Sequence, residues 1–504
     1  MIKKLLAVIL VLTVVVPLAV FEALKTDVSA AEGTFWEYIE DTHTLRLYGT
    51  GAIPNYVTRD DAPWYKEYKD RITTVVIEDG VTEIGNRAFS YSSVKFVEIP
   101  DTVTRIGKEA FTHCSSLVSV NIPDSVKTIE DSAFSSCENM VALDLGNGAE
   151  TIGQYAFAFS KNLASVTIPP SVKTIGYYAF KPSYGGKLTV TFSEGLEVIG
   201  AEAFGGIQNT KVTIPDSVRI IGNKAFEGCR NLTEVVTGEN LIEIGEKAFA
   251  GDDAPKYGVT SVDLSRSQKL TTIGVSAFAY TKIMQVDIPD SVETIGGSAF
   301  YRCSQLEKIE LPNNKTTIGS NAFTGAAIAS IEIPEGVKSL GHGAFSACKN
   351  LTKVAIPHSV ISIDINAFYE CTSLTAVDIS GIDLALPEYG AFDRCPITHV
   401  HIPSLLPIEY FAGKNNLPTD ENCFFKIGAD GKCPAAVCPF REGEGTVGDV
   451  NGDGKLNNTD IILLGRAYMA GDGDKYLSVA DMNNDGRITN ADIILLGRLY
   501  MTGK

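Results

Sequence analysis

Residues 106–123 read Ile-Gly-Lys-Glu-Ala-Phe-Thr-His-Cys-Ser-Ser-Leu-Val-Ser-Val-Asn-Ile-Pro, and variants of this stretch fill most of the chain. The Ala-Phe pair recurs fourteen times, with steps of 22 to 24 residues between successive Phe residues except for one longer step. A unit of this length cannot cover its own apolar side chains, so the period predicts a solenoid in which each repeat covers the next. The repeated Phe residues are Phe89, Phe111, Phe134, Phe157, Phe180, Phe204, Phe226, Phe249, Phe278, Phe300, Phe323, Phe345, Phe368 and Phe392.

Each repeat contains a second apolar pattern, which predicts a β-strand. Leu117, Val120 and Ile122 follow apolar-x-x-apolar-x-apolar spacing, and Pro123 ends the run because proline has no N–H to donate to a ladder. Alternate residues of a strand point to opposite faces, so the residues between these apolar positions are expected to face solvent. The Gly that follows Ile before most Ala-Phe pairs favours a bend.

Over residues 72–402 this unit resembles the BspA or treponemal type of bacterial leucine-rich repeat. The resemblance implies a β-rich leucine-rich-repeat solenoid, with a parallel β-sheet on the concave face and an irregular or short helical convex side. A solenoid end exposes unpaired backbone and apolar surface, so residues 31–71, with Trp36 and Trp64, are predicted to be an N-terminal cap. Residues 403–446 are predicted to form a C-terminal cap and linker.

The chain begins with the features of an export signal. Two lysines precede an apolar run over residues 5–16, and Val28-Ser29-Ala30 offers the small residues that a signal peptidase reads. Residues 1–30 are therefore predicted to be a cleaved signal peptide. An uncleaved anchor needs about 20 apolar residues, whereas Pro17 interrupts this run. We expect a mature chain that has no membrane span and is secreted to the outside of the cell.

Seven of the ten cysteines share one repeat position, three residues after the Phe. Ser, Thr or Ala fills this position in other repeats, so the position is expected to require a small side chain rather than a partner. Equivalent Cβ atoms on stacked strands lie about 4.8 Å apart, farther than the ~3.8 Å of a disulfide. Free, buried thiols are therefore expected at Cys114, Cys137, Cys229, Cys303, Cys348, Cys371 and Cys395. The remaining three, Cys423, Cys433 and Cys438, allow at most one internal disulfide.

Two similar loops rich in oxygen-bearing side chains lie near the C-terminus. Residues 449–460 read Asp-Val-Asn-Gly-Asp-Gly-Lys-Leu-Asn-Asn-Thr-Asp, and residues 481–492 repeat the pattern. Loop positions 1, 3, 5, 9 and 12 carry oxygen side chains, position 6 is Gly and position 7 offers a backbone carbonyl, which is the pattern of a calcium loop. The predicted ligands of two Ca²⁺ ions are Asp449, Asn451, Asp453, Lys455, Asn457, Asp460, Asp481, Asn483, Asp485, Arg487, Thr489 and Asp492.

The tail differs from a common EF-hand in two respects. Asp460 and Asp492 replace the usual Glu at position 12, and residues 445–448 cannot supply a helix before the first loop. In both respects residues 447–504 resemble the type I dockerin family, a small all-α calcium-binding domain. The resemblance implies docking onto a cohesin domain of a scaffold protein, in cellulosome-type complexes that degrade plant polysaccharides. The cohesin-contacting residues that it implies are Asn458, Thr459, Arg466, Asn490, Ala491 and Arg498.

Composition and charge limit what the solenoid can bind. The formal net charge is −18, from 61 acidic and 43 basic residues, and no run of Lys and Arg offers a phosphate-binding surface. These features argue against nucleic acid as a partner. Asp263, Asp287, Glu310 and Glu332 occupy the same solvent-facing strand position in four successive repeats. They form either a solvated face or an acidic stripe that attracts a basic protein or peptide.

Other ligands of the solenoid are less favoured. Sugar sites usually carry aromatic rings, and Phe96 is the one aromatic residue that the pattern places on the strand face. A protein ligand is therefore expected before a glycan. His399 and His401 share one strand face, but the sequence offers no nearby third ligand, so solvent-exposed histidines are expected rather than a metal site.

No catalytic motif is recognisable in the chain. The sequence has no G-x-S-x-G, no H-E-x-x-H and no phosphate loop, and residues 403–440 are too few for a hydrolase domain of usual size. We therefore expect a non-catalytic protein, at the cell surface or in a cellulosome, whose solenoid presents a protein-recognition or adhesion surface. The alternatives are a glycan-binding accessory subunit and a glycoside hydrolase whose paired carboxylates the sequence does not reveal.

Overall fold

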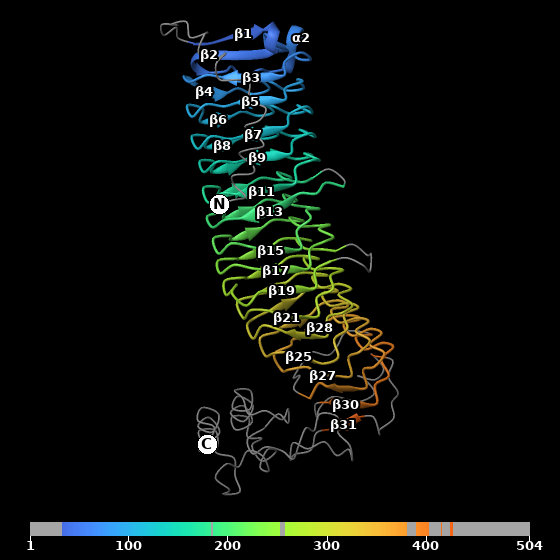
Figure 1. The fold of residues 1–504 in the computed structure, drawn as a ribbon. Helices are drawn as coiled ribbons and strands as arrows, with labels where there is room; N and C mark the ends of the chain where they lie inside the picture. Colours follow the sequence, from blue (N-terminus) through green and yellow to red (C-terminus); the bar gives the residue numbers. More distant parts are fainter. Residues whose placement is uncertain are drawn as a thin grey trace, which may run out of the picture.

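The computed structural model describes residues 33–182, 185–251, 258–380, 390–402, 415 and 424–426. Over these residues the chain winds into stacked rungs that form a long, curved solenoid (Figure 1). The predicted signal peptide, the linker cysteines and both predicted calcium loops lie outside the described residues. Of the helices in the described part, none is both long and apolar enough to cross a membrane.

Each rung contributes one strand to each of two rows. The first row contains the strands that the apolar alternation predicts: β3 (Thr74–Ile77), β5 (Phe96–Glu98), β7 (Ser119–Asn121), β9 (Ala142–Asp144), β11 (Ser165–Ile168), β13 (Thr189–Phe192), β15 (Lys211–Thr213), β17 (Glu234–Val236), β19 (Ser261–Asp263), β21 (Gln285–Asp287), β23 (Lys308–Glu310), β25 (Ile331–Glu332), β27 (Lys353–Ala355), β29 (Ala376–Asp378) and β30 (His399–Ile402). One further strand, β31 (Phe424–Lys426), extends this row beyond the predicted repeats. The second row was not predicted from the sequence: β4 (Val81–Ile84), β6 (Arg105–Ile106), β8 (Thr128–Ile129), β10 (Thr151–Ile152), β12 (Thr174–Ile175), β14 (Val198–Ile199), β16 (Ile220–Ile221), β18 (Glu243–Ile244), β20 (Thr272–Ile273), β22 (Thr294–Ile295), β24 (Thr317–Ile318), β26 (Ser339–Leu340) and β28 (Ser362–Ile363).

Strands of successive rungs pair in parallel and in register, so equivalent residues lie side by side. Val166 pairs with Val190 in the first row, and Ile175 pairs with Ile199 in the second. The predicted parallel-sheet solenoid is therefore confirmed, and the remainder of each rung consists of turns. Within the described segments, helix occurs before the first full repeat, as η3 (Glu40–Thr42), η4 (Arg59–Asp61) and α2 (Tyr65–Tyr68).

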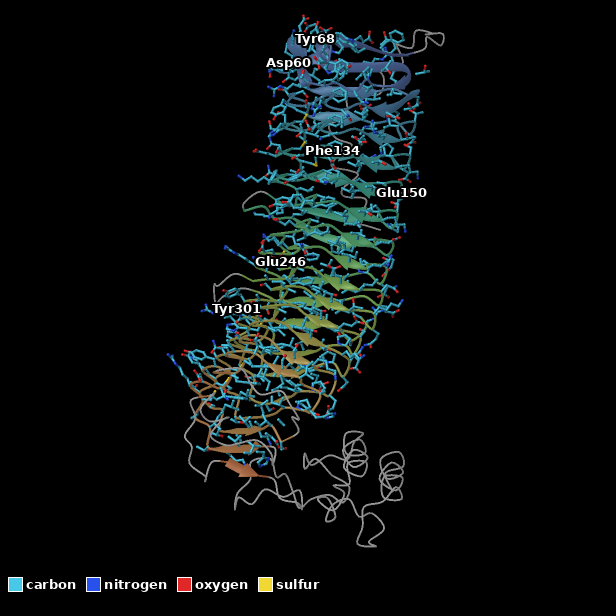
Figure 2. The ribbon with its side chains drawn as sticks, turned by 180° about the vertical axis from the view of Figure 1, so that it is seen from behind. Asp60, Tyr68, Phe134, Glu150, Glu246 and Tyr301 are labelled. Carbon is cyan, nitrogen blue, oxygen red and sulfur yellow. The ribbon has the colours of Figure 1, made fainter. Side chains whose placement is uncertain are left out.

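The fourteen repeated Phe side chains form a continuous stack through the core. Centroids of neighbouring rings lie 4.9 to 5.7 Å apart, and the ring planes are within 22° of parallel. Phe134, the third Phe of the stack and labelled among the upper rungs in Figure 2, has no exposed surface. The backbone reinforces the stack, because the N–H of Phe111 donates to the carbonyl of Ala133 on the next rung at 2.7 Å.

Two positions of most rungs take the left-handed backbone conformation although they are not glycine. They lie two residues before and two residues after the Phe, as at Glu109 (φ 56°) and His113 (φ 57°). This conformation costs roughly 1–2 kcal/mol for a residue with a Cβ. Hydrogen bonds between rungs offset the cost, since the N–H of His113 donates to the carbonyl of Ser135 at 2.8 Å.

The first rung is covered by residues that do not follow the repeat. β1 (Gly33–Ile39) pairs antiparallel with β2 (Thr44–Ala52), and β2 pairs in parallel with both β3 and β4. The two rows of strands therefore begin on one long strand. Trp64 is 3% exposed and packs between this segment and the first Phe of the stack.

The repeat cysteines are free thiols, as predicted, and six of them are buried, whereas Cys395, also predicted to be buried, is partly exposed. Contrary to the expectation that this position has no partner, each Sγ donates to the carbonyl of the Phe on the preceding rung, at 3.0 to 3.3 Å. Cys348 and Phe323 form one such pair. Burial raises the pKa of Cys114 to about 11 and that of Cys348 to about 12. Thiols in this state behave as small apolar side chains that also satisfy a buried carbonyl.

Candidate interaction surfaces

The solvent-facing side of the first strand row is the surface on which the sequence predicts a ligand. Asp263, Asp287, Glu310 and Glu332 lie on β19, β21, β23 and β25, and all four side chains are exposed. Asp287 pairs with Glu310 in the register of β21 and β23. The structure therefore brings these carboxylates to neighbouring rungs of one face.

Neighbouring groups compensate part of this negative charge. Lys308 Nζ lies 3.3 Å from Oε1 of Glu310, two residues along the same strand. Asp263 Oδ1 accepts a hydrogen bond from the N–H of Ser265 at 2.9 Å, and hydrogen bonding by Ser265 lowers the pKa of Asp263. Exposed contacts of this kind contribute at most about 1 kcal/mol each. The stripe is therefore acidic but not uniformly so.

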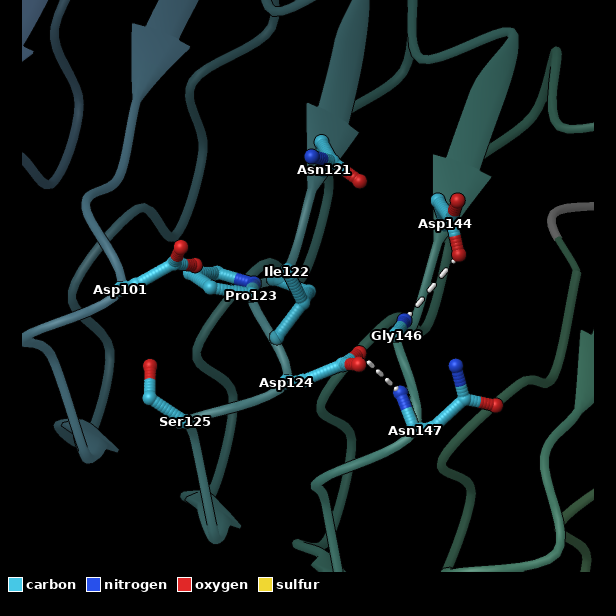
Figure 3. A pocket seen from close by; sticks show the side chains of 9 residues that line it. All are labelled: Asp101, Asn121, Ile122, Pro123, Asp124, Ser125, Asp144, Gly146 and Asn147. Carbon is cyan, nitrogen blue, oxygen red and sulfur yellow. Dashed lines mark hydrogen bonds between the residues drawn. The ribbon is translucent and has the colours of Figure 1, made fainter.

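A shallow polar cavity of about 580 Å³ lies at the ends of β7 and β9 (Figure 3). Its lining includes Asp101, Asn121, Asp124, Asp144 and Asn147. Two of the carboxylates stabilise the turn that follows β9. Asp144 accepts a hydrogen bond from the N–H of Gly146 at 3.1 Å, and Asp124 accepts one from the N–H of Asn147 at 2.6 Å. Gly146, with φ of 57°, replaces the Pro that ends this strand in most repeats. That replacement is the sequence signal for the cavity.

The predicted exposure of His399 and His401 is wrong. The two residues on β30 are 6% and 4% exposed. They also do not end the row, since β31 pairs beyond β30. The two Nε2 atoms lie 2.9 Å apart, and Nδ1 of His401 lies 3.0 Å from Oδ2 of Asp378 on β29. A carboxylate only accepts, so His401 donates through Nδ1 and accepts through Nε2 from the Nε2–H of His399.

This hydrogen-bonded chain explains how two buried imidazoles are tolerated on the face of β30 opposite the core residues Val400 and Ile402. Burial, and after it the proximity of His401, lowers the pKa of His399 to about 4. His399 is therefore neutral at physiological pH, and Asp378 fixes the tautomer of His401. Among the described residues, no group of three or more His, Cys, Asp or Glu side chains is arranged to hold a metal ion.

Aromatic side chains gather on the turns beside the Phe stack, on an edge that the sequence did not single out. In Figure 2, Tyr301 lies along this edge and Glu150 lies along the opposite one. Tyr91, two residues after a repeated Phe, is 45% exposed, and its ring stacks on His113 at 4.4 Å. Phe159 occupies the same repeat position three rungs after Tyr91 and is 37% exposed. The signal that identifies this row is an aromatic residue at a fixed distance from the repeated Phe.

A second group of rings adjoins Phe159. Tyr155 stacks on Tyr178 of the next rung at 5.0 Å, and the centroid of Phe159 lies 6.5 Å from that of Tyr155. Lys181 Nζ lies 4.3 Å from the centroid of the Tyr178 ring and pairs with Glu202 at 2.5 Å. Aromatic surface and charged hydrogen-bonding groups therefore lie together on this edge.

The predicted calcium ligands and cohesin-contacting residues, all between Asp449 and Arg498, lie outside the described residues. Two families nevertheless match the chain. The BspA type leucine rich repeat region matches residues 65–187, 183–307 and 294–417, and the dockerin type I domain matches residues 447–499. Among curated proteins, none matches the chain.

Several solved structures are similar to this chain. A leucine-rich repeat protein from Bacteroides ovatus is 21% identical, with a TM-score of 0.43, and the match covers 79% of this chain and 100% of that protein. One from Eubacterium ventriosum is 23% identical, with a TM-score of 0.38 and coverage of 76% and 97%. The pneumococcal vaccine antigen PcpA is 19% identical, with a TM-score of 0.37 and coverage of 77% and 96%. Because the repeat matches span residues 65–417, the chain belongs to the BspA type leucine-rich repeat family, and it carries a type I dockerin domain.

Proposed function

We propose that this chain is a secreted, non-catalytic subunit that docks onto a cohesin domain of a cellulosome-type scaffold. There its solenoid presents a recognition surface during polysaccharide degradation. The observation that carries the proposal is the presence, in one chain, of repeats over residues 65–417 and a type I dockerin over residues 447–499. The apolar segment before Ala30 supports secretion.

The proposed docking step depends on calcium. Asp449, Asp453, Asp481 and Asp485 occupy loop positions whose hard oxygen atoms suit Ca²⁺, and two loops in tandem support two ions. Ion binding supplies folding free energy to small metal-dependent domains, so calcium is expected to order the docking surface. That surface includes Asn458, Thr459, Arg466, Asn490, Ala491 and Arg498.

A panel of immobilised cohesin domains tests this docking with the full chain. At least one cohesin is expected to capture the chain in Ca²⁺, and EDTA is expected to abolish capture. The double variant Asp453→Ala/Asp485→Ala should lose capture, whereas the matched variant Asp263→Ala/Asp287→Ala, which removes two carboxylates from the solenoid, should keep it. Capture that persists in EDTA, or the failure of every cohesin, contradicts the proposal.

For the solenoid, the acidic stripe supports recognition of a basic protein or peptide. Asp263, Asp287, Glu310 and Glu332 lie on neighbouring rungs, and a focused negative potential speeds the association of a cationic partner. A lysine-rich peptide is the probe. Its association should slow with added salt and in the variant Asp287→Lys/Glu310→Lys, but much less in Glu150→Lys/Glu246→Lys, which makes the same charge change away from the stripe. Equal association rates of the peptide with the two variants contradict the proposal.

Glycan binding is the second candidate function, and a specific observation favours it. The shortage of aromatic residues on the strand face argues against sugars, but rings gather on the turn edge instead, where Tyr91 and Phe159 are exposed and Tyr155 is partly exposed. Aromatic rings with polar neighbours are the usual lining of carbohydrate sites. The turn edge is therefore the part of the solenoid where a glycan is expected.

A further inference from the structure

We propose that the polar cavity at the ends of β7 and β9 binds an arginine side chain of a basic protein partner, between the carboxylates of Asp101 and Asp124. This site is separate from the acidic stripe. It shares with the stripe proposal only the basic class of partner, so that either proposal can fail alone. Figure 3 shows Asp101 and Asp124 around the cavity together with Asp144, on three neighbouring rungs.

Asp101 and Asp124 occupy one repeat position, the turn position, defined as the second residue after the last core position of a first-row strand. Rungs stack about 4.8 Å apart, so one ligand can reach equivalent side chains on adjacent rungs. The backbone is also equivalent there. Asp124 accepts from the N–H of Asn147 on the next rung at 2.6 Å, and Asp216 accepts from the N–H of Glu239 at 3.2 Å. Turn positions of different rungs are therefore comparable.

One place in the solenoid shows what a pair of acidic turn positions binds. Asp216, Glu239 and Arg266 occupy the turn position on three successive rungs. A single guanidinium nitrogen, Nη2 of Arg266, lies 2.7 Å from Oδ2 of Asp216 and 2.8 Å from Oε1 of Glu239. Arg266 thus reaches the carboxylates of both preceding rungs. Within this chain, two acidic turn positions already hold one guanidinium.

The N-terminal rungs have the acidic residues of this arrangement without the basic one. Glu335 and His358 are a second internal pair at adjacent turn positions, with Nδ1 of His358 2.8 Å from Oε1 of Glu335. Asp79, Asp101 and Asp124 occupy the turn position on three successive rungs, and the next rung supplies an amide instead of a base. Adjacent carboxylates repel one another, and a cation between them relieves that repulsion. The cation is therefore expected to come from a partner.

The carboxylates of the cavity keep oxygen atoms that a ligand can use. Asp101 makes no hydrogen bond or ion pair with another residue that the structure describes. Asp124 and Asp144 each use Oδ1 to accept a backbone N–H, which leaves Oδ2 available. The lining contains no Lys or Arg. Lys127, which precedes β8, donates to the carbonyl of Gly148 at 3.5 Å rather than to these carboxylates.

The chemistry of the lining favours a guanidinium over other cations. Ca²⁺ takes about six to eight oxygen ligands, whereas the described residues contain no group of three or more His, Cys, Asp or Glu arranged to hold a metal ion. An ammonium is a compact point charge, but a guanidinium is a planar fork with several N–H donors that can bridge two carboxylates. The side-chain oxygens of Asn121 and Asn147 in the lining can accept the remaining donors.

Fluorescence anisotropy of the full chain tests the site, with a labelled peptide of alternating arginine and glycine and a fixed Ca²⁺ concentration. Asp101→Asn/Asp124→Asn removes the charge but keeps the shape, and it should raise the Kd of the peptide about fivefold, the loss expected for an exposed ion pair. Glu150→Gln/Glu246→Gln makes the same charge change elsewhere and should bind as the wild type does. The matching lysine peptide should lose less affinity in Asp101→Asn/Asp124→Asn. Equal losses for the two peptides overturn the assignment of a guanidinium.

The decisive variant is Asn147→Arg, which copies the internal arrangement. It places an arginine at the turn position one rung after Asp124, as Arg266 lies one rung after Glu239. The new guanidinium should occupy the cavity and raise the Kd of the arginine peptide about fivefold. Gln154→Arg adds the same charge at an exposed position of the same rung and should bind as the wild type does. Equal Kd values for these two variants overturn the inference.

The reverse change creates a site. In the Asp101→Asn/Asp124→Asn chain, the further substitution Arg266→Asn uncovers two acidic turn positions and should restore the lost affinity. Arg219→Asn removes the same charge from the second strand row and should not. An unchanged thermal unfolding midpoint checks the fold of each variant. If both substitutions restore binding equally, net charge rather than the turn position controls the affinity, and the inference is overturned.

The remaining outcomes separate this site from the acidic stripe and from a metal site. If Asp287→Lys/Glu310→Lys weakens binding of the arginine peptide but Asp101→Asn/Asp124→Asn does not, the inference is overturned while the stripe proposal stands. If added Ca²⁺ displaces the peptide more than NaCl of equal ionic strength does, the cavity binds a metal ion and the inference is overturned. If neither peptide binds the wild-type chain, both proposals are contradicted.

Discussion

Trp64 stacks on Phe89, with 5.6 Å between ring centroids and 19° between planes, and its Nε1–H donates to the carbonyl of Ala88 at 2.9 Å. These contacts repeat the link between rungs, where one ring stacks on the next and a backbone N–H donates to the carbonyl of the Ala before it. At the other end, the side-chain carbonyl of Asn415 accepts from the N–H of Phe392 at 3.3 Å. Side chains therefore continue the ladder where the repeat stops.

Replacement of Trp64 is expected to destabilise the solenoid in a graded way. Trp64→Ala removes the buried ring and should lower the free energy of unfolding by about 3–5 kcal/mol. Trp64→Phe keeps a ring for the stack but leaves the Ala88 carbonyl without its donor, a loss of about 1–2 kcal/mol. Urea unfolding of the full chain measures both, with Trp36→Phe as the control. Equal losses for the two Trp64 variants would show that the hydrogen bond and the stack cannot be separated.

The left-handed turn positions predict a sharp dependence on side-chain branching. Ala347 has φ of 54°, a conformation in which a β-branched residue is strongly disfavoured. Ala347→Val should therefore destabilise the chain by about 1–2 kcal/mol, whereas Ala347→Gly should be neutral or slightly stabilising. The same substitution at Ala355, exposed at the end of β27, is the control and should be neutral, because strands favour valine. Equal effects at the two alanines would contradict the conformational argument.

The period of the Phe residues was sufficient to predict the solenoid and its core, because every rung repeats the same apolar positions, whereas its parallel sheet was implied by the resemblance to bacterial leucine-rich repeats. The second row of strands was missed because strands such as Thr294–Ile295 are too short to show an alternation. The burial of His399 was missed because the repeat pattern places its position on the solvent-facing side of the strand, where Gln285 and Lys308 are exposed on earlier rungs. The exposed rings of the turn edge were missed for another reason. They are at positions of the turn, and only the stacking of rungs brings Tyr91 beside His113.

Six of the seven repeat thiols are expected to be unreactive in the folded chain. Burial raises the pKa of Cys229 and of Cys303 to about 12, and thiolate is the reactive species. Cys395 is the exception, because it is partly exposed and its hydrogen bond with Cys371 lowers its pKa. A chain with Cys423, Cys433 and Cys438 changed to serine should therefore give at most one reactive thiol with Ellman's reagent at pH 8, and seven thiols in denaturant. Rapid native reaction of several thiols would contradict the burial of this row.

The hydrogen bond of each thiol predicts which replacements are tolerated. Ser92 and Thr281 fill the cysteine position in other rungs, and their hydroxyl groups donate to the carbonyl of the Phe in their own rung at 2.6 and 2.8 Å. Cys348→Ser should therefore keep a buried hydrogen bond and cost less than Cys348→Ala, which leaves a cavity. Cys348→Ala also removes one of two donors to the Phe323 carbonyl, since the N–H of Ala326 still donates to it at 3.1 Å, so its loss from the hydrogen bond alone is about 1 kcal/mol. Thermal unfolding orders the two variants. The reverse order would show that the position selects for size alone.

His399 is expected to make the stability of the last rungs depend on pH. Its pKa is about 4 in the folded chain and about 6.5 in an unfolded chain. Between these values the unfolded chain binds the proton more strongly than the folded chain. The contribution of His399 to stability therefore falls as the pH drops from about 6.5 to about 4, and it does not change further outside this window. The full loss is up to about 3 kcal/mol.

His399→Gln separates this titration from the loss of carboxylates. The Gln side-chain NH₂ can donate to Nε2 of His401, as His399 does, so the chain that ends at Asp378 is kept without the titrating group. Urea unfolding at pH 7.5 and pH 5.0 should show a larger loss on acidification in the wild type than in His399→Gln. His342→Gln, at an exposed histidine, is the control and should lose as much stability on acidification as the wild type does. The contrary outcome is that His399→Gln loses as much stability as the wild type between pH 7.5 and pH 5.0. In that outcome the buried histidine does not cause the pH dependence, which then comes from the carboxylates of the solenoid.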